Sequence, residues 1–179
     1  SFSVPSSWKG RDVMLNFGAV DWQTDVWVNG AKVGSHTGGY TPFSLNITQA
    51  LKSKGDNEVV VRVWDPTDKG HQPRGKQISK PELIWYTPVT GIWQTVWLEP
   101  VARKHVAGLR ILPDIDRNTL KVDVNPSEKI SNGMVEVVVK DNGRQIASGR
   151  AVTGESVIVD MPSDIELWSP ENPKLYDLE

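Results

Sequence analysis

The stretch AVDWQTDVWVNGAKVGSHTGGYTPFSLNIT, residues 19–48, decides the fold. Within it, apolar residues alternate with others over 25–28, and this period of two is typical of a half-buried β-strand. Asn29-Gly30 follows at once and favours a type I′ turn, because both central residues of that turn need a positive φ. The stretch therefore predicts a β-hairpin whose return strand covers 31–34.

Alternation of the same kind recurs along the chain. It covers 13–17, 43–47, 59–63 and 92–99 in the first part of the chain, and 109–111, 120–124, 135–139, 145–152 and 157–161 in the second. Asp141-Asn142-Gly143-Arg144 supplies a second Asn-Gly turn. A short helical turn is expected over 48–54, with Thr48 as its N-cap and Gly55 as its stop. Short strands at intervals of about 8–12 residues with turn signals between them indicate β-sandwiches rather than βαβ units.

The tryptophans divide the chain in two. Of the eight tryptophans, only Trp168 lies after the segment 100–104. We place a domain boundary there and expect an all-β protein with two domains, 1–103 and 104–179. A tryptophan ring is a flat platform for ligands, although packing is the commoner use of any single one.

Residues 65–91, DPTDKGHQPRGKQISKPELIWYTPVTG, interrupt the strands of the first domain. They include four prolines and three glycines. A loop of this length in a compact domain is usually functional or disordered, and binding residues concentrate on loops. Asp65 and Asp68 are the carboxylates of this loop that we expect to contact ligand hydroxyls.

Composition excludes several classes of protein. The chain has 179 residues, a formal net charge of −2 and no cysteine. Disulfides, thiolate chemistry and Cys-based metal sites are therefore excluded, and no nucleic-acid partner is expected, because such a partner needs a basic face. No apolar run approaches the ~18 residues of a membrane span, so no membrane partner is expected either. A (β/α)8 barrel usually takes ~250 residues and does not fit here.

No pattern in the sequence supplies a complete catalytic centre. His36, His71 and His105 lack the spacing of a metal motif, and neither a G-x-S-x-G elbow nor a phosphate-binding loop occurs. The carboxylates are scattered, so spacing pairs no two of them as the acid and nucleophile of a glycosidase. Asp56-Asn57-Glu58 leaves calcium as a weak option, although a turn is the simpler interpretation. We expect no catalytic residue, no metal and no cofactor in this chain.

Several motifs occur together along the chain. They are the hairpin Val26-Trp27-Val28-Asn29-Gly30, the return Val33-Gly34, the loop Gly38-Gly39-Tyr40, the strand start Pro42-Phe43, TGIWQTVWLEPV at 90–101 and LWSPENPKLYDLE at 167–179. The first five resemble the sugar-binding jelly-roll domain of glycoside hydrolase family 2, which includes β-galactosidases, β-glucuronidases and β-mannosidases. The last resembles the end region of the immunoglobulin-like domain that follows the jelly roll in this family.

The resemblance implies a jelly-roll β-sandwich at 1–103 and an immunoglobulin-like β-sandwich at 104–179. Family members continue into a (β/α)8 barrel that carries both catalytic glutamates, and the motifs of that barrel do not occur here. Ser1–Pro5 matches a point after the first strands of the jelly roll, and Leu178-Glu179 falls within the last strands of the second domain. We therefore expect a fragment that lacks strands at both ends and covers its open edges by forming a homo-oligomer.

By this resemblance the chain is a non-catalytic part of a retaining, β-galactosidase-like glycosidase from a bacterium, periplasmic or secreted by analogy. Its partners are then a carbohydrate and the enzyme's own (β/α)8 catalytic domain. The jelly roll helps to form the substrate pocket, and the immunoglobulin-like domain is a spacer. In β-galactosidase-like members an acidic residue of the long loop approaches the sugar. The candidate substrate-binding residues are therefore five in that loop: Asp65, Asp68, Glu82, Trp85 and Tyr86.

Two other functions stay open on the sequence alone. The first is a free-standing carbohydrate-binding module or lectin, and affinity for sugars without any barrel would distinguish it. The second is an adhesion or scaffold sandwich without a ligand, and an ordered, polar-lined loop at 65–91 argues against it.

Overall fold

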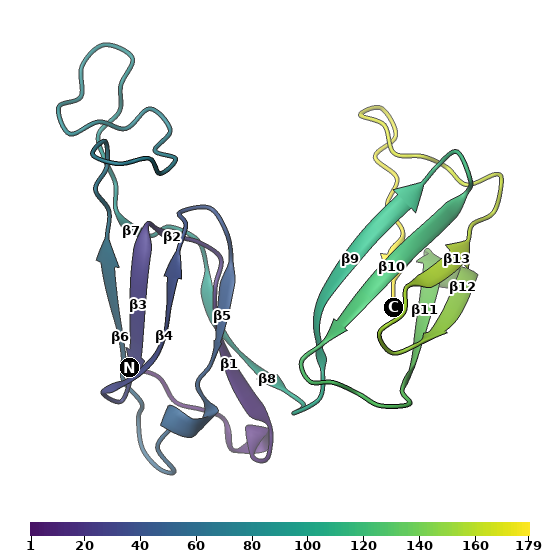
Figure 1. Cartoon of the computed structure of the whole chain (residues 1–179), viewed down its shortest axis with the longest axis horizontal. Helices are drawn as coiled ribbons and strands as arrows, with labels where there is room; N and C mark the ends of the chain where they lie inside the picture. Colours follow the sequence, from purple (N-terminus) through teal and green to yellow (C-terminus); the bar gives the residue numbers. More distant parts are fainter. The chain divides into compact units, whose positions relative to one another are not determined.

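The computed structural model describes all residues from 1 to 179. The chain divides into two compact units, Ser1–Arg103 and Lys104–Glu179 (Figure 1). Both are built from β-strands, and the helical content is two single 3-10 turns, η1 at Ser6–Trp8 and η2 at Thr48–Ala50. No helix has the length and apolar character needed to cross a membrane.

The first unit is a β-sandwich of two three-stranded antiparallel sheets. One has the order β5-β1-β8, with bounds Phe43–Asn46, Asp12–Phe17 and Val96–Val101. The other has the order β4-β3-β6, with bounds Ala31–Thr37, Gln23–Val28 and Val59–Trp64. A two-stranded antiparallel ladder joins β2, Val20–Asp21, to β7, Gly91–Ile92.

The core of the first unit forms between its sheets because side chains alternate in direction along each strand. Val26 and Val28 of β3 are fully buried and belong to the same apolar cluster as Leu15 and Phe17 of β1. Phe17 stacks on Phe43 with ring centroids 4.7 Å apart. The hydrophobic alternation of the sequence thus marks the buried face of each strand.

The Asn29-Gly30 turn is confirmed, with φ values of 50° and 82°. Asn29 also has a role that the turn pattern did not indicate. Its amide Nδ2 donates to the Ala50 carbonyl at 2.7 Å and to Asn57 Oδ1 at 2.8 Å, and its Oδ1 accepts from the Glu58 amide at 3.0 Å. The side chain therefore ties the hairpin to the segment that precedes β6.

The single strand predicted over 92–99 is wrong. The chain forms β7 and β8 instead, with a break between Ile92 and Val96. The backbone amides of Trp93 and Gln94 both donate to the Ala19 carbonyl, at 3.3 and 3.4 Å. This irregular bonding replaces the ladder and turns the chain between two different sheets.

The helical turn predicted over 48–54 is also shorter than expected. It is the single turn η2, whose N-cap residue is Ile47 and which makes no side-chain capping bond. Thr48 lies inside it, and its Oγ1 accepts a hydrogen bond from the Val13 amide at 2.9 Å. The hydroxyl that could cap the turn thus stabilises the start of β1.

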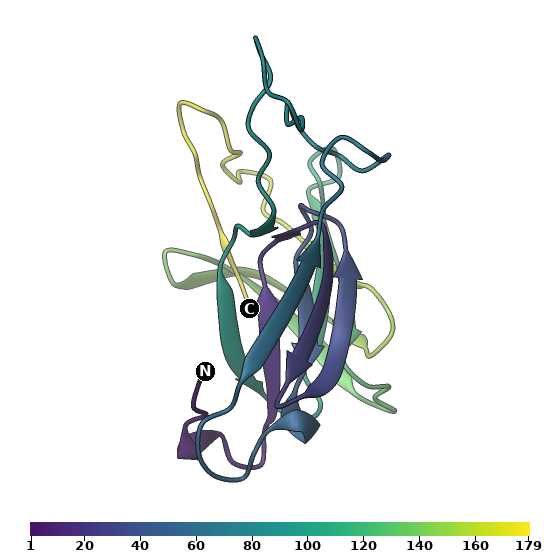
Figure 2. The same ribbon diagram turned by 90° about the vertical axis from the view of Figure 1, so that its left-hand side faces the viewer.

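Residues 65–90 form the long loop between β6 and β7. Figures 1 and 2 show this loop extending beyond the strand ends of the first unit. A bridge between Gln77 and Tyr86 closes its middle, where the Tyr86 amide donates to the Lys76 carbonyl at 2.6 Å. The loop is therefore hydrogen-bonded to itself rather than a simple open connection.

The second unit is a β-sandwich of two further three-stranded antiparallel sheets. One has the order β13-β10-β9, with bounds Val157–Asp160, Thr119–Pro126 and Val106–Asp114. The other has the order β12-β11-β14, with bounds Arg144–Val152, Met134–Asp141 and Asp177–Leu178. Its core is a cluster of valines: Val122, Val137, Val139, Val157 and Val159. The predicted Asn142-Gly143 turn between β11 and β12 is confirmed, with φ values of 48° and 80°.

Candidate functional site

A surface cavity of about 310 Å³ lies in the first unit. Its lining comes from β2, from the turn after β4, and from the segment that runs from the long loop through β7 to Trp93. The lining residues are Asp21, Tyr40, Gln77, Val89, Thr90, Gly91, Ile92 and Trp93. The fold therefore brings together three segments that are far apart in the sequence.

Asp21 reaches this cavity through the ladder of β2 and β7. In that ladder Asp21 pairs with Gly91, so the strand that ends the long loop holds its backbone. The Gly18 amide donates to the Thr95 carbonyl at 2.8 Å. This hydrogen bond joins the residues just before β2 to those just after β7. The position of Asp21 is thus set by a pairing between residues about 70 apart in the chain.

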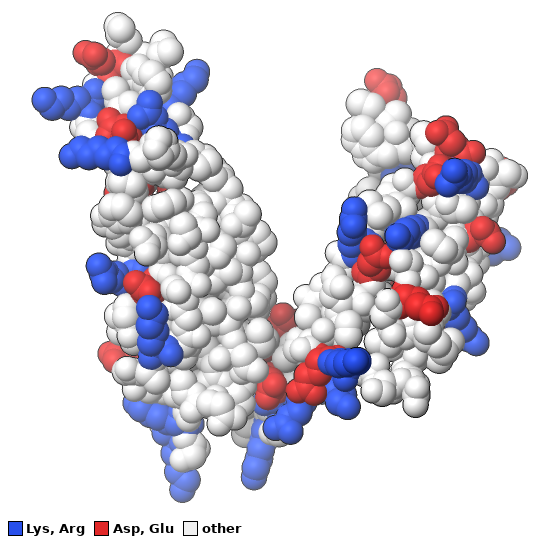
Figure 3. Space-filling view, in the orientation of Figure 1, with Lys and Arg blue, Asp and Glu red and all other residues white.

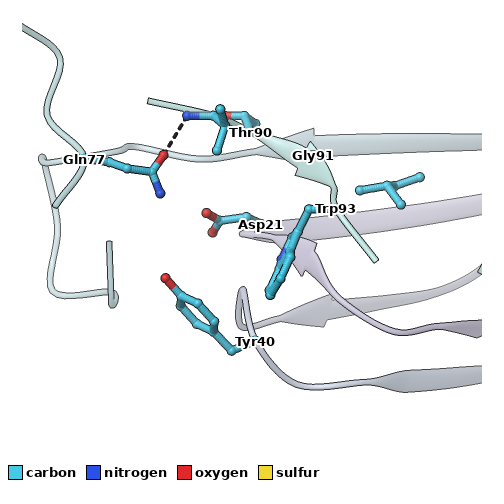
Figure 4. Close-up of a pocket in the computed structure, with 8 residues that line it drawn as sticks. Asp21, Tyr40, Gln77, Thr90, Gly91 and Trp93 are labelled. Atoms are coloured by element: carbon cyan, nitrogen blue, oxygen red, sulfur yellow. Dashed lines mark hydrogen bonds between the residues drawn. The ribbon is translucent and has the colours of Figure 1, made fainter. Parts of the chain in front are cut away.

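The Asp21 carboxylate lies nearly buried without a donor. The residue is 9% exposed, and no hydrogen bond or ion pair reaches its side chain. Burial raises the pKa of the carboxyl, and the negative charge of Asp65 raises it further. The carboxylate oxygens are not fully enclosed, so a donor from a ligand could reach them through the cavity. Figure 4 shows the carboxylate directed into the cavity.

Gly39 makes room for this carboxylate. A Cβ atom at Gly39 would lie 2.5 Å from Asp21 Oδ1, so any larger residue would displace the aspartate side chain. The Gly39 carbonyl accepts a hydrogen bond from Trp93 Nε1 at 2.7 Å. Trp93 in turn meets the Tyr40 ring edge-on, with centroids 5.8 Å apart. The Gly38-Gly39-Tyr40 loop therefore positions both the acid and the aromatic wall of the cavity.

The remaining polar groups complement the acceptor. Gln77 Oε1 accepts a hydrogen bond from the Val89 amide at 2.6 Å, which leaves the Nε2 hydrogens available as donors (Figure 4). The Tyr40 hydroxyl can donate or accept. Trp93 is 52% exposed and offers an apolar ring beside them. An acceptor, a donor and a half-exposed ring in one cavity suit a small polyhydroxylated ligand with an apolar face.

Asp65 and Asp68, which the sequence predicted to contact ligand hydroxyls, bond within the long loop. Asp65 Oδ1 accepts from the Thr67 amide at 2.7 Å, and its Oδ2 accepts from the hydroxyl of Thr90, a cavity residue, at 3.0 Å. Asp68 accepts from both the amide and the hydroxyl of Ser79, at 3.0 and 2.6 Å. Hydrogen bonds from Ser79 lower the pKa of the Asp68 carboxyl. Both aspartates thus shape the loop, and Asp65 holds the side chain of Thr90, which lines the cavity.

The other three predicted residues lie further along the loop. The Glu82 carbonyl accepts from the Trp85 amide at 3.0 Å, and the Arg74 guanidinium lies 5.4 Å from the Trp85 ring centroid. Tyr86 is 64% exposed. None of the five predicted residues is in the cavity lining, and their contact with a substrate stays a prediction.

The sequence indicated the elements of the cavity but not its polar residues. Asp21 is one of the scattered carboxylates that no motif marks, and Gln77 belongs to no motif. One local signal does point to Asp21, because it is the only charged residue in the apolar segment Gly18-Ala19-Val20-Asp21-Trp22, where Ala19 and Val20 are fully buried.

The segment considered for calcium has a structural role. Asn57 is buried, and its Oδ1 accepts hydrogen bonds from Asn29 Nδ2 at 2.8 Å and from the Lys52 amide at 2.9 Å. No group of three or more histidine, aspartate or glutamate side chains in residues 1–179 is placed to hold a metal ion.

Two family models match the chain. The model described as the sugar binding domain of glycosyl hydrolases family 2 matches residues 1–99. A second model, described as glycosyl hydrolases family 2, matches residues 104–179. The two matches together cover both units of the structure.

Named relatives are enzymes much longer than this chain. A β-galactosidase from Thermoanaerobacter pseudethanolicus is 28% identical over 99% of the chain and 24% of its own length. A putative β-glucuronidase from Formosa agariphila is 30% identical over 92% of the chain and 19% of its own length. Across the first eight relatives, the chain spans between 17% and 31% of their length.

Solved structures share the fold. The β-glucuronidase from Ruminococcus gnavus in complex with D-glucuronic acid aligns over 99% of this chain and 32% of its own, with a TM-score of 0.76 and 22% identity. The same enzyme in complex with D-glucaro-d-lactam aligns with a TM-score of 0.77. The prediction of an all-β fold, with a jelly-roll sandwich followed by an immunoglobulin-like sandwich, is confirmed.

Proposed function

This chain belongs to glycosyl hydrolases family 2, and we propose that it supplies carbohydrate-binding groups beside a catalytic centre and does not itself carry out hydrolysis. The whole protein would then be a β-galactosidase-like glycosidase. Its relatives include proteins named β-galactosidase and β-glucuronidase, which supports a β-glycoside as the substrate class.

The observation that carries this proposal is the unpartnered Asp21 carboxylate. This carboxylate lacks a donor from the protein and faces a cavity that also holds the free Gln77 amide and the Trp93 ring. Sugar hydroxyls would donate to Asp21, and the C–H face of a pyranose would pack on the ring. The first unit therefore has the groups needed to form one wall of a substrate pocket.

A non-catalytic role fits the carboxylates at this cavity. Retaining glycosidases use two carboxyl groups about 5–5.5 Å apart, one as acid and one as nucleophile. Asp21 is the carboxylate in the lining, and the neighbouring Asp65 has both oxygens engaged by Thr67 and Thr90. We assign the hydrolytic step to a (β/α)8 catalytic domain of the whole protein, and the role of spacer to the second unit.

Calorimetric titration of this chain with galactose, lactose, glucuronate and mannose tests the proposal. We expect weak binding of one of these sugars, because one wall of a pocket supplies only part of its contacts. Asp21→Ala should abolish the heat of binding, and Asp56→Ala, at an exposed aspartate of the same unit, should leave it unchanged. Equal binding by both variants, or no binding of any sugar, would contradict a sugar site at Asp21.

A hydrolysis assay with nitrophenyl β-galactoside tests the non-catalytic part separately. The purified chain should release no nitrophenol above the buffer rate. Turnover that disappears in Asp21→Ala would show that the chain is itself an enzyme.

A free-standing carbohydrate-binding module is the second candidate. It is favoured by one observation, that the cavity combines the half-exposed Trp93 ring with the polar groups of Asp21 and Gln77. Such a module should bind its sugar with micromolar rather than millimolar affinity in the same titration, and addition of a catalytic domain should leave that affinity unchanged.

A further inference from the structure

The outer face of the β4-β3-β6 sheet carries a second group of polar and aromatic residues, separate from the cavity at Asp21. On β3, Gln23 and Asp25 alternate with the buried Thr24 and therefore face outward. Their direct partners on β6 are Trp64 and Arg62. A hollow of about 340 Å³ lies among these four outward residues. Figure 3 shows a short row of charged side chains over this sheet.

The charges on this face leave one cation without a partner. Asp25 is directly opposite Arg62 in the register, yet its carboxylate pairs with Lys32 on the other neighbouring strand, with Lys32 Nζ 2.6 Å from Oδ1. No ion pair or hydrogen bond reaches the Arg62 guanidinium. The row Lys32–Asp25–Arg62 thus has a net charge of +1, located on a guanidinium that faces solvent.

An aromatic platform lies next to this guanidinium. The Trp64 side chain is 51% exposed, and the Trp22 ring supports it with centroids 5.9 Å apart. Gln23, directly opposite Trp64, makes no side-chain hydrogen bond and leaves its amide free. A flat ring, a free amide and an unpaired guanidinium therefore border one hollow.

We propose that this face binds an oligosaccharide that carries uronate carboxylates. A pyranose ring would stack on Trp64, its hydroxyls would bond to the Gln23 amide, and the carboxylate would pair with the Arg62 fork. A guanidinium can donate two parallel hydrogen bonds to the two oxygens of a carboxylate, and a neutral hydroxyl cannot accept such a pair. This site shares no residue with the cavity at Asp21 and does not depend on the function proposed for that cavity.

The test uses tetragalacturonate as the probe and a neutral galactotetraose as the comparison. Two-dimensional NMR of the whole chain follows the tryptophan indole signals while each sugar is added. We expect tetragalacturonate to shift the Trp64 signal and to bind at least about tenfold more tightly than the neutral sugar. A tenfold difference in affinity is what one hydrogen bond between charged groups would provide. This preference should weaken with added salt.

Three variants test the assigned roles. Arg62→Gln should lose the preference for tetragalacturonate, and Trp64→Ala should lose the binding of both sugars. Lys32→Met would free Asp25 to pair with Arg62, so it should weaken tetragalacturonate binding about as much as Arg62→Gln does. Asp56→Ala, at an exposed aspartate outside both sites, is the control and should bind tetragalacturonate unchanged. The indole signal of Trp93 reports whether each variant is folded.

The outcomes separate clearly. No binding of tetragalacturonate, equal affinity for both sugars, or unchanged affinity in Arg62→Gln would each overturn the proposal. A shift of the Trp93 signal instead of the Trp64 signal would also overturn it, because the probe would then occupy the cavity at Asp21.

Discussion

Replacement of Asp21 by asparagine is expected to stabilise the first unit at neutral pH. The residue is 9% exposed, its carboxylate has no hydrogen-bond donor, and the charge of Asp65 adds repulsion. Partial burial and the repulsion from Asp65 disfavour the charged form of this carboxyl, while its oxygens remain open to the cavity. Asparagine keeps the size of the side chain and removes the charge, and solvent in the cavity screens part of the penalty, so we expect a gain in the free energy of unfolding of about 1 kcal/mol.

The sign of the pH dependence follows from the raised pKa of Asp21. The folded chain holds this proton more tightly than the unfolded chain, in which the carboxyl has its ordinary pKa of about 3.8. The stability that the protonated carboxyl contributes is fully present below that value and is lost as the pH rises through the folded-state pKa. The stability gained in Asp21→Asn should therefore be largest near neutral pH and should disappear as the pH falls below the ordinary pKa of about 3.8.

Urea unfolding followed by tryptophan fluorescence measures this effect on the first unit. Among the eight tryptophans only Trp168 lies outside that unit, so the signal reports it almost alone. Asp56→Asn, at an exposed aspartate, is the matched control and should change stability by less than about 0.5 kcal/mol. Two results would refute the reasoning. One is an Asp21→Asn variant that is no more stable than the original chain at neutral pH, and the other is a gain in stability that is as large in acid as at neutral pH.

Three further substitutions have defined expected outcomes. Thr24→Val removes a buried hydroxyl that has no partner and should stabilise the first unit by about 1 kcal/mol in the same urea assay, whereas a loss of stability would show that the hydroxyl is satisfied. Asn29→Ala removes three side-chain hydrogen bonds and should lower the free energy of unfolding of the first unit by about 3 kcal/mol. Asn142→Ala, in the equivalent turn of the second unit, should cost that unit about 1 kcal/mol, and equal costs would contradict the role of the three Asn29 hydrogen bonds. Ser79→Ala removes the hydroxyl donor and keeps the backbone amide donor. It should therefore raise the pKa of Asp68 part of the way toward its ordinary value in an NMR titration, and an unchanged pKa would exclude the hydrogen bond from the Ser79 hydroxyl.

The parts of the fold that the sequence predicted are those with a local cause. The hairpin at Asn29-Gly30 and the turn at Asn142-Gly143 need only a residue pair that tolerates positive φ. Strand faces follow from alternation, because each buried residue is two positions from the next. These signals lie within a few residues of the structure that they determine.

The parts that the sequence did not predict depend on distant partners. The break after β7 exists because the Ala19 carbonyl accepts from Trp93 and Gln94, which no pattern in 92–99 records. The cavity depends on the pairing of Asp21 with Gly91 across the whole long loop. Asp65 was a reasonable candidate by its position in that loop, but its oxygens are engaged by neighbouring donors, a detail of loop geometry rather than of composition.

NMR detection of the Trp93 indole tests the central claim most directly. Its Nε1 hydrogen is fixed on the Gly39 carbonyl at 2.7 Å, and its ring forms a wall of the cavity beside Asp21. If the chain supplies carbohydrate-binding groups, the sugar selected by calorimetry should shift this signal in a saturable way and should leave it unmoved in Asp21→Ala. A sugar that binds without shifting the Trp93 signal, or that shifts it equally in Asp21→Ala, would contradict the claim.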